Sequence, residues 1–217
     1  VVSELPETDW VAHVRRELAP VQAGRFFVYG SHDADKVPAD SIPLLIEASM
    51  AFGTGHHGTT LGCLRALDRL AEAGFEAGKV ADIGCGTAVL AMAAACLWPD
   101  PVLASDIDAV AVEVAASNAA ANGLADNVIC VEAAGFAHPA LTEAAPFDLV
   151  FANILKGPLV ALAPDMALHV RKGGYAILSG ILNEQAETVL DVYAQSGFNP
   201  VHREEIVDWT TITLMKN

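Results

Sequence analysis

The sequence predicts an α/β fold, with a mostly parallel sheet and helices on both of its faces. From residue 79 onward, short apolar segments typical of strands alternate with longer segments of helical periodicity. This alternation is typical of parallel strands joined by crossover helices. The tail from residue 199 contains two strand-like segments with no helix between them. Because two successive strands joined by a tight turn run in opposite directions, we expect one antiparallel strand at the end of the sheet.

The individual elements are predicted from their apolar spacing and from the glycines that follow them. Apolar residues recur at helical spacing in the helical segments, as at Leu61, Leu64 and Leu67, and several of these segments end at glycine. The predicted strands are 25–30, 42–48, 79–83, 101–107, 127–132, 147–154, 175–180, 199–209 and 210–217. The predicted helices are 10–18, 59–73, 87–98, 109–123, 157–170 (kinked or restarted at Pro164 and ended by Gly173 and Gly174) and 183–197.

The composition is that of a globular protein with one well-buried core. The chain has 217 residues, 53% of them hydrophobic, a net charge of −15 and 4 cysteines, none in a CxxC pair. No apolar run reaches the ~18 residues of a membrane span, and the start shows no signal pattern. We therefore expect a soluble, cytoplasmic protein with reduced thiols and no membrane partner. The acidic charge repels a phosphate backbone, so we expect no direct nucleic-acid partner. It would suit a cationic partner, but the preferred interpretation is that it only keeps an alanine-rich protein in solution.

The segment ADIGCGTAVLAMAA, residues 81–94, has the pattern of a strand, a glycine turn and a helix. Ligands of open α/β sheets bind at the carboxyl ends of strands, and glycine allows the backbone to approach a ligand closely. Val89 replaces the third glycine of a dinucleotide-binding GxGxxG turn, and its branched side chain would block a pyrophosphate. Asp82 precedes Gly84 and Gly86, and its carboxylate would repel phosphate but attract an ammonium group.

A second acidic residue, Asp106, ends the next predicted strand about 20 residues after the first glycine, the spacing of ribose-binding acids on such sheets. A carboxylate at that place accepts hydrogen bonds from both ribose hydroxyls of an adenosine. Asp82, the 84–86 turn and Asp106 together describe a site for a nucleoside with an ammonium group and no phosphate, and S-adenosylmethionine is such a molecule. The alternative is a tight structural turn with two acidic residues at strand ends.

The stretch AFGTGHHGTT, residues 51–60, leads into the predicted helix 59–73 and admits three interpretations. It matches the spacing of a phosphate-binding GxxxxGK[ST] loop, but Thr59 occupies the place of the lysine that holds the terminal phosphates. A metal site would need a third ligand besides His56 and His57, and adjacent side chains on extended backbone point apart. A glycine loop before a helix N-terminus favours an anion instead, such as the carboxylate of a methionine moiety. Thr60 would add a hydrogen bond there or cap the helix.

Several of these segments resemble the ribosomal protein L-eleven methyltransferase family (PrmA), and they occur in that family's order. They are AFGTGHHGTT, DIGCGTAVLAMAA, SDIDAVAVEVAASNAAANG, FANILKGPLVALAP and LSGILNEQAETVLDVYAQSGF, within residues 45–217. The glycine turn alone indicates only a methyltransferase. The AFGTG-H-TT stretch together with ANIL and SGIL is specific to the family.

The resemblance implies the class I S-adenosylmethionine-dependent methyltransferase fold, a Rossmann-like seven-stranded sheet with the last strand antiparallel. It implies S-adenosylmethionine as cofactor and methyl transfer to amines of the large-subunit ribosomal protein L-eleven, at lysine side chains and at the N-terminus. Loop 52–55 would fold over the cofactor. The expected cofactor-binding residues are Phe52, Gly53, Thr54, Gly55, Thr60, Asp82, Gly84, Gly86, Asp106, Ile107 and Asn153.

Four features depart from the family's pattern. His57 is followed by Gly58, where many members carry His-Pro. The family's turn usually reads GCGSG, whereas residues 84–88 read GCGTA, so Ala88 replaces the last glycine. Lys156 stands where small residues are common, and its charge would affect the approach of an acceptor lysine. The family also carries an N-terminal recognition domain, for which the segment before residue 45 is too short. We therefore expect a lead-in or linker segment at 1–44 and a methyltransferase domain at 45–217.

Asn153, at the end of the predicted strand 147–154, is the expected catalytic residue. Its amide would accept a hydrogen bond from the target amine and aim the lone pair for in-line attack on the sulfonium methyl, with the proton lost to water. A strand-terminal Asn that only makes a turn is the alternative. Alternative functions are methylation of another protein or of a small-molecule amine, an NAD-dependent oxidoreductase, and a non-catalytic module that binds the cofactor. No metal is expected.

Overall fold

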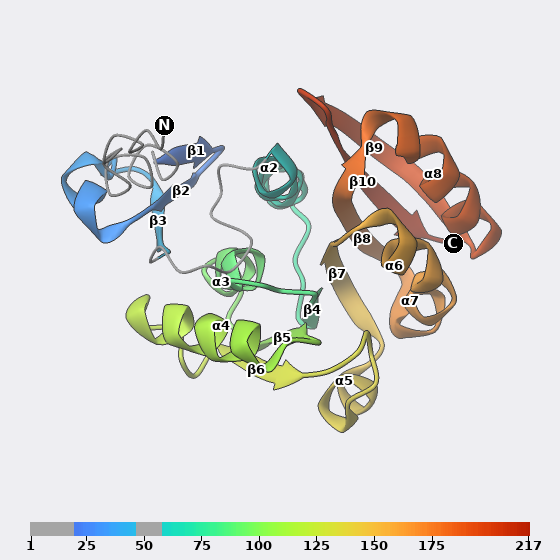
Figure 1. Cartoon of the computed structure of the whole chain (residues 1–217), viewed down its shortest axis with the longest axis horizontal. Helices are drawn as coiled ribbons and strands as arrows, with labels where there is room; N and C mark the ends of the chain where they lie inside the picture. The colour runs from blue at the N-terminus through green and yellow to red at the C-terminus, as the bar shows by residue number, and fades with distance from the viewer. Residues whose placement is uncertain (1–19, 47–57) are drawn as a thin grey trace, which may run out of the picture.

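The computed structural model describes residues 20–46 and 58–217, and a seven-stranded sheet forms the centre of the larger part (Figure 1). Its strands, in chain order, are β4 (Val80–Ile83), β5 (Val102–Asp106), β6 (Val128–Glu132), β7 (Phe147–Asn153), β8 (Val170–Leu182), β9 (Phe198–Ile206) and β10 (Trp209–Lys216). In the sheet they lie in the order β6-β5-β4-β7-β8-β10-β9. The strands β4 to β8 pair in parallel, and β10 runs antiparallel to both β8 and β9. The expected sheet with an antiparallel last strand is therefore confirmed.

Helices cover both faces of this sheet, as the sequence predicted. They are α2 (Gly58–Glu72), α3 (Val89–Ala95), α4 (Ala109–Ala121), α5 (Pro139–Ala144), α6 (Lys156–Ala161), α7 (Ala163–His169) and α8 (Ala186–Gln195). Successive strand residues point to opposite faces. Val80 and Leu149 therefore share an apolar cluster with residues of α2, α3 and α4, whereas Ala81 and Val150 share a second cluster with residues of α5 to α8. Within the described residues, no helix is both long and apolar enough to cross a membrane.

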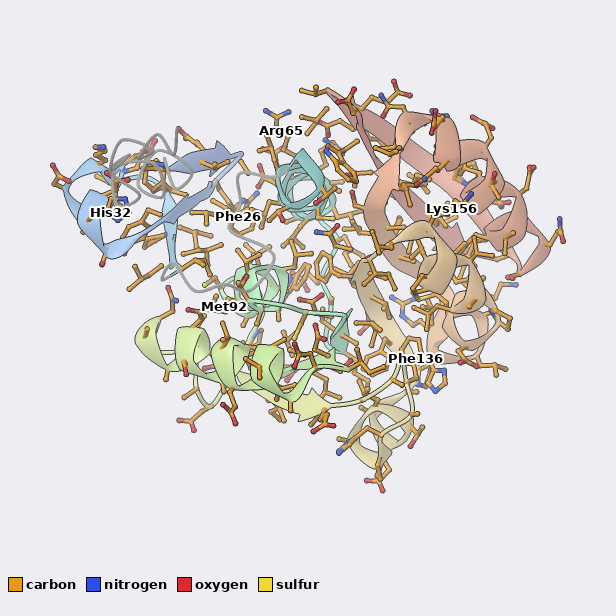
Figure 2. The ribbon with its side chains drawn as sticks, viewed as in Figure 1. Phe26, His32, Arg65, Met92, Phe136 and Lys156 are labelled. Carbon is orange, nitrogen blue, oxygen red and sulfur yellow. The ribbon has the colours of Figure 1, made fainter. Side chains whose placement is uncertain are left out.

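A three-stranded sheet of β1 (Val21–Ala23), β2 (Phe26–Tyr29) and β3 (Ile42–Leu45) packs onto the same core. Its strand β2 pairs antiparallel with β1 and parallel with β3. Phe26 is fully buried in the apolar cluster that also contains Met92 of α3, and Figure 2 shows both among the packed side chains between this sheet and the helices. The boundary expected at residue 45 falls at the end of β3, and the division of the chain there stays a prediction.

Polar contacts fasten the small sheet to the helices of the main sheet. Asn122, just after α4, donates from Nδ2 to the carbonyl oxygen of Leu45 (2.7 Å) and accepts at Oδ1 from the N–H of Leu45 (2.8 Å). The Asn122 side chain thus takes the place that a neighbouring strand would take beside β3. The guanidinium of Arg25 forms an ion pair with the carboxylate of Asp68 on α2.

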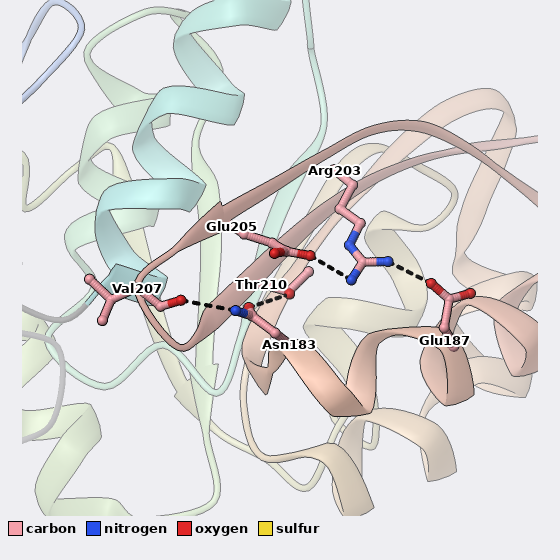
Figure 3. Close-up of polar contacts among 6 residues, drawn as sticks. All are labelled: Asn183, Glu187, Arg203, Glu205, Val207 and Thr210. Carbon is pink, nitrogen blue, oxygen red and sulfur yellow. Dashed lines mark hydrogen bonds and ion pairs between the residues drawn. The ribbon is translucent and has the colours of Figure 1, made fainter.

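The hairpin of β9 and β10 is anchored where β8 ends. Asn183, just after β8, donates from Nδ2 to the carbonyl oxygen of Val207 in the hairpin turn (2.9 Å), as Figure 3 shows. Arg203 on β9 bridges Glu187 of α8 (2.6 Å) and Glu205 (2.7 Å) in the same view. The hairpin turn is therefore held at the edge of the sheet where the parallel strands end.

The predicted end of a helix at Gly173 and Gly174 is wrong. The helix α7 ends at His169, and β8 begins at Val170 and runs through both glycines. Gly173 has a φ of +73°, and a Cβ at Gly174 would lie 3.0 Å from the carbonyl oxygen of Asp148 on β7. The two glycines therefore allow β8 to bend and to approach β7 closely, a use of glycine that the sequence pattern does not separate from a helix end.

Other differences concern short elements and boundaries. The sequence did not predict β1, with 3 residues, or α5, with 6 residues, because neither is long enough to show a periodic pattern. The restart of the helix near Pro164 is confirmed, since α6 ends at Ala161 and α7 begins at Ala163. The predicted helix 10–18 lies outside the described residues.

Replacing Asn122 by Ala should lower the free energy of unfolding by about 1–3 kcal/mol, because two hydrogen bonds to the backbone of Leu45 are lost. For a domain of this size, 1 kcal/mol corresponds to about 2–4 °C in Tm. The matched control is Glu113→Ala at an exposed position of α4, which should change the free energy by less than about 0.5 kcal/mol. Thermal unfolding followed by circular dichroism measures both. Equal midpoints for the two variants would show that Asn122 does not hold the small sheet.

Candidate functional site

The predicted site residues gather where β4, β5 and β7 end. Ile83 on β4 pairs in parallel register with Ser105 on β5 and with Ala152 on β7, so the residues that follow these positions share one edge of the sheet. This edge carries the glycine turn after β4, Asp106 at the end of β5 and Asn153 at the end of β7. Loop residues Phe52, Gly53, Thr54 and Gly55 and the pair His56 and His57 lie outside the described residues.

The glycine turn is held by hydrogen bonds to the end of β5. The N–H groups of Gly84 and Cys85 both donate to the carbonyl oxygen of Ser105, at 2.8 and 2.9 Å. The N–H of Gly86 donates to Oδ2 of Asp106 at 2.9 Å. All three N–H groups are therefore engaged within the protein, and a pyrophosphate would compete with these bonds for its donors. This geometry argues against a dinucleotide in the manner of a GxGxxG turn.

The turn continues through left-handed backbone into α3. Gly84 and Gly86 have φ values of +73° and +54°, which glycine adopts without steric cost. Ala88 also has a positive φ, 61°, and is the N-cap of α3. The alanine at the family's glycine position therefore keeps the left-handed turn despite its Cβ, and α3 starts at Val89. Val89 is 3% exposed, so it fills the core beneath the turn instead of leaving room for a ligand.

Asp82 lies beneath the turn and is 1% exposed. Its Oδ2 accepts a hydrogen bond from the N–H of Ala91 in α3 (3.2 Å), while its Oδ1 is buried and has no partner among the described residues. Burial raises the pKa of this carboxyl to about 7, and the nearby carboxylate of Asp106 adds to the effect. A buried carboxylate oxygen without a partner fits a ligand that brings a positive charge, as the ammonium and sulfonium groups of S-adenosylmethionine do.

Asp106 and Ile107 form the part of the edge that suits a nucleoside. Asp106 is half-buried; besides the contact with Gly86, its Oδ1 accepts from the N–H of Asp108 at 3.1 Å. Each carboxylate oxygen retains a further lone pair for a hydroxyl donor. Ile107 is 73% exposed, unusually open for a large apolar side chain, and gives a flat base an apolar surface next to Asp106.

Asn153 and Thr60 meet on the other side of the turn. The Nδ2 of Asn153 lies 3.5 Å from the hydroxyl of Thr60, which is 1% exposed near the start of α2. No hydrogen bond to Oδ1 of Asn153 occurs among the described residues, so this oxygen can accept from an incoming amine. After Asn153 the chain continues through Ile154 and Leu155 to Lys156, the first residue of α6. The charge of Lys156 therefore lies three residues after the Asn153 amide in the sequence.

Cys85 occupies the centre of the glycine turn and is 7% exposed. Burial raises the pKa of its thiol, and the carboxylates of Asp82 and Asp106 raise it further. The thiol is therefore protonated and is not a nucleophile of the site. Within residues 20–46 and 58–217, no group of three or more His, Cys, Asp or Glu side chains is placed to hold a metal ion.

The sequence did not identify two residues that shape this edge, Ile154 and Gly180. A Cβ at Gly84 would lie 2.3 Å from Cγ2 of Ile154, and a Cβ at Gly180 would lie 2.4 Å from the carbonyl oxygen of Ile154. Both residues belong to the ANIL and SGIL segments, which the sequence marked as family motifs without a physical role. The positive φ of Gly180, +81°, is a property of β8 that periodicity does not reveal.

Comparisons with known proteins show the family to which this chain belongs. A family model described as Ribosomal protein L11 methyltransferase (PrmA) matches residues 1–217. The ribosomal protein L11 methyltransferase of Brucella abortus (strain S19) is 49% identical to this chain over 214 residues, which make up 97% of this chain and 74% of the relative. The protein of the same name from Chelativorans sp. (strain BNC1) is 50% identical over 216 residues, or 98% of this chain and 73% of the relative.

Solved structures of related proteins have the same fold. The crystal structure of ribosomal protein L11 methylase from Lactobacillus delbrueckii subsp. bulgaricus is similar with a TM-score of 0.80 and 27% identity, covering 91% of this chain and 99% of that one. The precorrin-6y C5,15-methyltransferase from Geobacter metallireducens GS-15 shares the fold, with a TM-score of 0.56, 19% identity, and coverage of 70% and 87%. The fold and the relatives agree, and the chain belongs to the ribosomal protein L11 methyltransferase family, whose members are S-adenosylmethionine-dependent methyltransferases.

Proposed function

We propose that this chain transfers methyl groups from S-adenosylmethionine to amine nitrogens of ribosomal protein L11, at lysine side chains and at the N-terminus. The names of relatives at 49% and 50% identity support the substrate. The observation that carries the chemistry is the unpartnered buried oxygen of Asp82 beneath a turn whose N–H groups are engaged by β5. Such a place suits a cationic nucleoside without phosphate. A ribosomal protein as substrate also assigns the proposed activity to the cytoplasm.

Each predicted cofactor-binding residue except Asn153 has a proposed contact with the cofactor. Asn153, which the sequence also placed among the cofactor contacts, is assigned instead to the acceptor amine. Asp106 would accept from the ribose hydroxyls, and Ile107 would pack against the adenine. The charge of Asp82 would stabilise the ammonium end. Thr60 and the first N–H groups of α2 would bind the carboxylate, since a helix N-terminus favours an anion. Gly84 and Gly86 would allow close approach of the backbone. Loop 52–55, with Phe52, Gly53, Thr54 and Gly55, would cover the bound molecule.

The bound cofactor supplies an activated methyl group, so the protein's own residues mainly position the acceptor. Oδ1 of Asn153 would accept a hydrogen bond from the acceptor amine and aim its lone pair. A lysine acceptor has an ordinary pKa of ~10.4 and must lose its proton before it can react. Exclusion of water at the sheet edge would lower that pKa, and we assign the proton to solvent.

Methyl transfer to purified ribosomal protein L11 tests the proposal directly. Tritiated S-adenosylmethionine should label L11 alone or in ribosomes from a strain that lacks the endogenous enzyme, and mass spectrometry should locate the label on amines. The two preparations decide whether the free protein or the assembled ribosome is the substrate. If neither is labelled while a small-molecule amine is, the L11 assignment is refuted but methyl transfer is not.

Replacing Asn153 by Ala should lower kcat at least about tenfold, because the amine loses the hydrogen bond that aims it. The dissociation constant of S-adenosylmethionine should change by less than about threefold, since the cofactor is held mainly by the ends of β4 and β5. Steady-state kinetics with L11 and calorimetry with the cofactor measure the two quantities. Wild-type turnover in this variant would remove Asn153 from any part in catalysis.

Replacing Asp106 by Ala should raise the dissociation constant of S-adenosylmethionine about tenfold or more, since two ribose hydrogen bonds are worth ~1–3 kcal/mol. The same loss is expected for 5′-methylthioadenosine, which has the ribose but neither the ammonium nor the carboxylate. Asp82→Asn is the matched comparison and should weaken only S-adenosylmethionine. Calorimetry with both ligands separates the roles. Equal effects of both substitutions on both ligands would contradict the assignment.

Asp82 also predicts a pH dependence of stability. Its carboxyl pKa is about 7 in the folded protein, against an ordinary value of 3.8, so the folded state retains a proton that the unfolded chain releases. Raising the pH through this interval therefore removes stability, and Asp82→Asn should escape the loss. The difference in Tm, Asp82→Asn minus wild type, should therefore be larger at pH 8 than at pH 5. The control Asp126→Asn, at an exposed position, should show the same difference at both pH values.

A further inference from the structure

Ile154 lies between two glycines that belong to different parts of the site. Its Cγ2 would be 2.3 Å from a Cβ added at Gly84, in the cofactor turn. Its carbonyl oxygen, carbonyl carbon and nitrogen would be 2.4, 2.7 and 2.8 Å from a Cβ added at Gly180. All these distances are under 3.0 Å, closer than real Cβ atoms approach their neighbours. Ile154 is thus packed against glycine on both sides, and it directly follows Asn153 in the chain.

Gly180 lies in a β-bulge of β8. Thr210 pairs with Ile181 and Ile212 pairs with Leu178, so Ser179 and Gly180 together face Thr211 alone. The left-handed backbone of Gly180, with φ +81°, is the conformation expected at such a bulge. Bulges occur often beside active sites, where they redirect a strand.

Polar contacts fix the bulge from the opposite side. Ser179 is fully buried and pairs with Asn153 in parallel register. Its hydroxyl donates to the carbonyl oxygen of Thr210 (3.0 Å) and lies 2.9 Å from the hydroxyl of Thr211. Thr211 in turn fills the space above Gly62 of α2, where an added Cβ would lie 2.2 Å from Oγ1 of Thr211. These contacts hold the residues on either side of the bulge, so a displacement of β8 at Gly180 away from Ile154 would strain them.

We propose that Ile154 is a positioning residue: packed by its side chain on Gly84 and by its backbone on Gly180, it fixes the Asn153 carboxamide relative to the cofactor turn. This inference rests on the role proposed above for Asn153. It assigns a physical task to the ANIL and SGIL segments. The isoleucine and the second glycine set the distance between the amine acceptor site and the donor site, and neither needs to touch the substrate.

The test compares Gly180→Ala with Gly74→Ala. Both glycines have a φ of +81°, but an added Cβ at Gly74 meets nothing within 4 Å, whereas at Gly180 it meets the backbone of Ile154. Left-handed alanine should cost each variant about 2–8 °C in Tm, and Gly180→Ala should lose more because its Cβ meets backbone atoms. Only Gly180→Ala should lower kcat about tenfold or more, because small displacements of a positioned group are costly in rate. Its dissociation constant for S-adenosylmethionine should remain within about threefold of wild type.

A second pair of variants keeps the proposal testable if Gly180→Ala does not fold. Ile154→Val retains Cγ2, the atom against Gly84, and should keep kcat within about threefold of wild type. Ile154→Leu has the same number of carbon atoms but no branch at Cβ, and it should lower kcat about tenfold.

The side-chain amide of Asn153 provides a readout that does not depend on turnover. In proton–nitrogen NMR spectra its two resonances, assigned by their loss in Asn153→Ala, should shift in Gly180→Ala and Ile154→Leu but not in Gly74→Ala or Ile154→Val. If Gly180→Ala matches Gly74→Ala in both kcat and spectrum, the positioning role is refuted. Full turnover of Asn153→Ala would instead refute the proposed catalytic role, and the spectra alone would then decide whether Ile154 positions the amide.

Discussion

The bonding of the glycine turn to the end of β5 is the constraint on which the rest of the site depends. The carbonyl oxygen of Ser105 and the carboxylate of Asp106 together accept from three successive N–H groups of the turn. These bonds fix the end of β4 relative to the end of β5. They also leave the turn with few free N–H groups that could bind a ligand. A turn of this kind presents acceptors and carboxylates to its ligand, which explains why the same α/β sheet that elsewhere binds dinucleotides here suits a cation.

The burial of the Asp82 carboxylate beneath the glycine turn is unfavourable for folding. One of its oxygens accepts a single backbone hydrogen bond, and the other is buried without a protein partner. Burial of that kind raises the pKa because the charged form is poorly solvated. Strongly perturbed carboxyl groups of this type concentrate at functional sites, where a ligand supplies the interaction that the protein withholds. With the cofactor contact proposed for Asp82, stability and cofactor binding would therefore make opposite demands on this residue.

Much of the site was predictable because it depends on local patterns at strand ends. A strand followed by glycines, an acid after the next strand and an amide after a later one placed Asp82, Asp106 and Asn153 on one edge. The position of β10 between β8 and β9 was not predictable, since strand order depends on pairing between distant segments. Glycine was also ambiguous: Gly174 permits close approach of two strands, and Gly180 forms a bulge, yet both read as ordinary turn signals.

The burial of Cys85 has a chemical consequence for an enzyme of this family. Methyl sulfonium compounds alkylate soft nucleophiles, and the thiolate is the reactive form of cysteine. Cys85 lies in the turn between the two aspartates, where burial and negative charge keep its sulfur protonated. Under the proposed cofactor site, the buried and protonated sulfur would be a poor target for the methyl group of the donor. The negative charge proposed to attract the donor would then also protect the protein from self-alkylation.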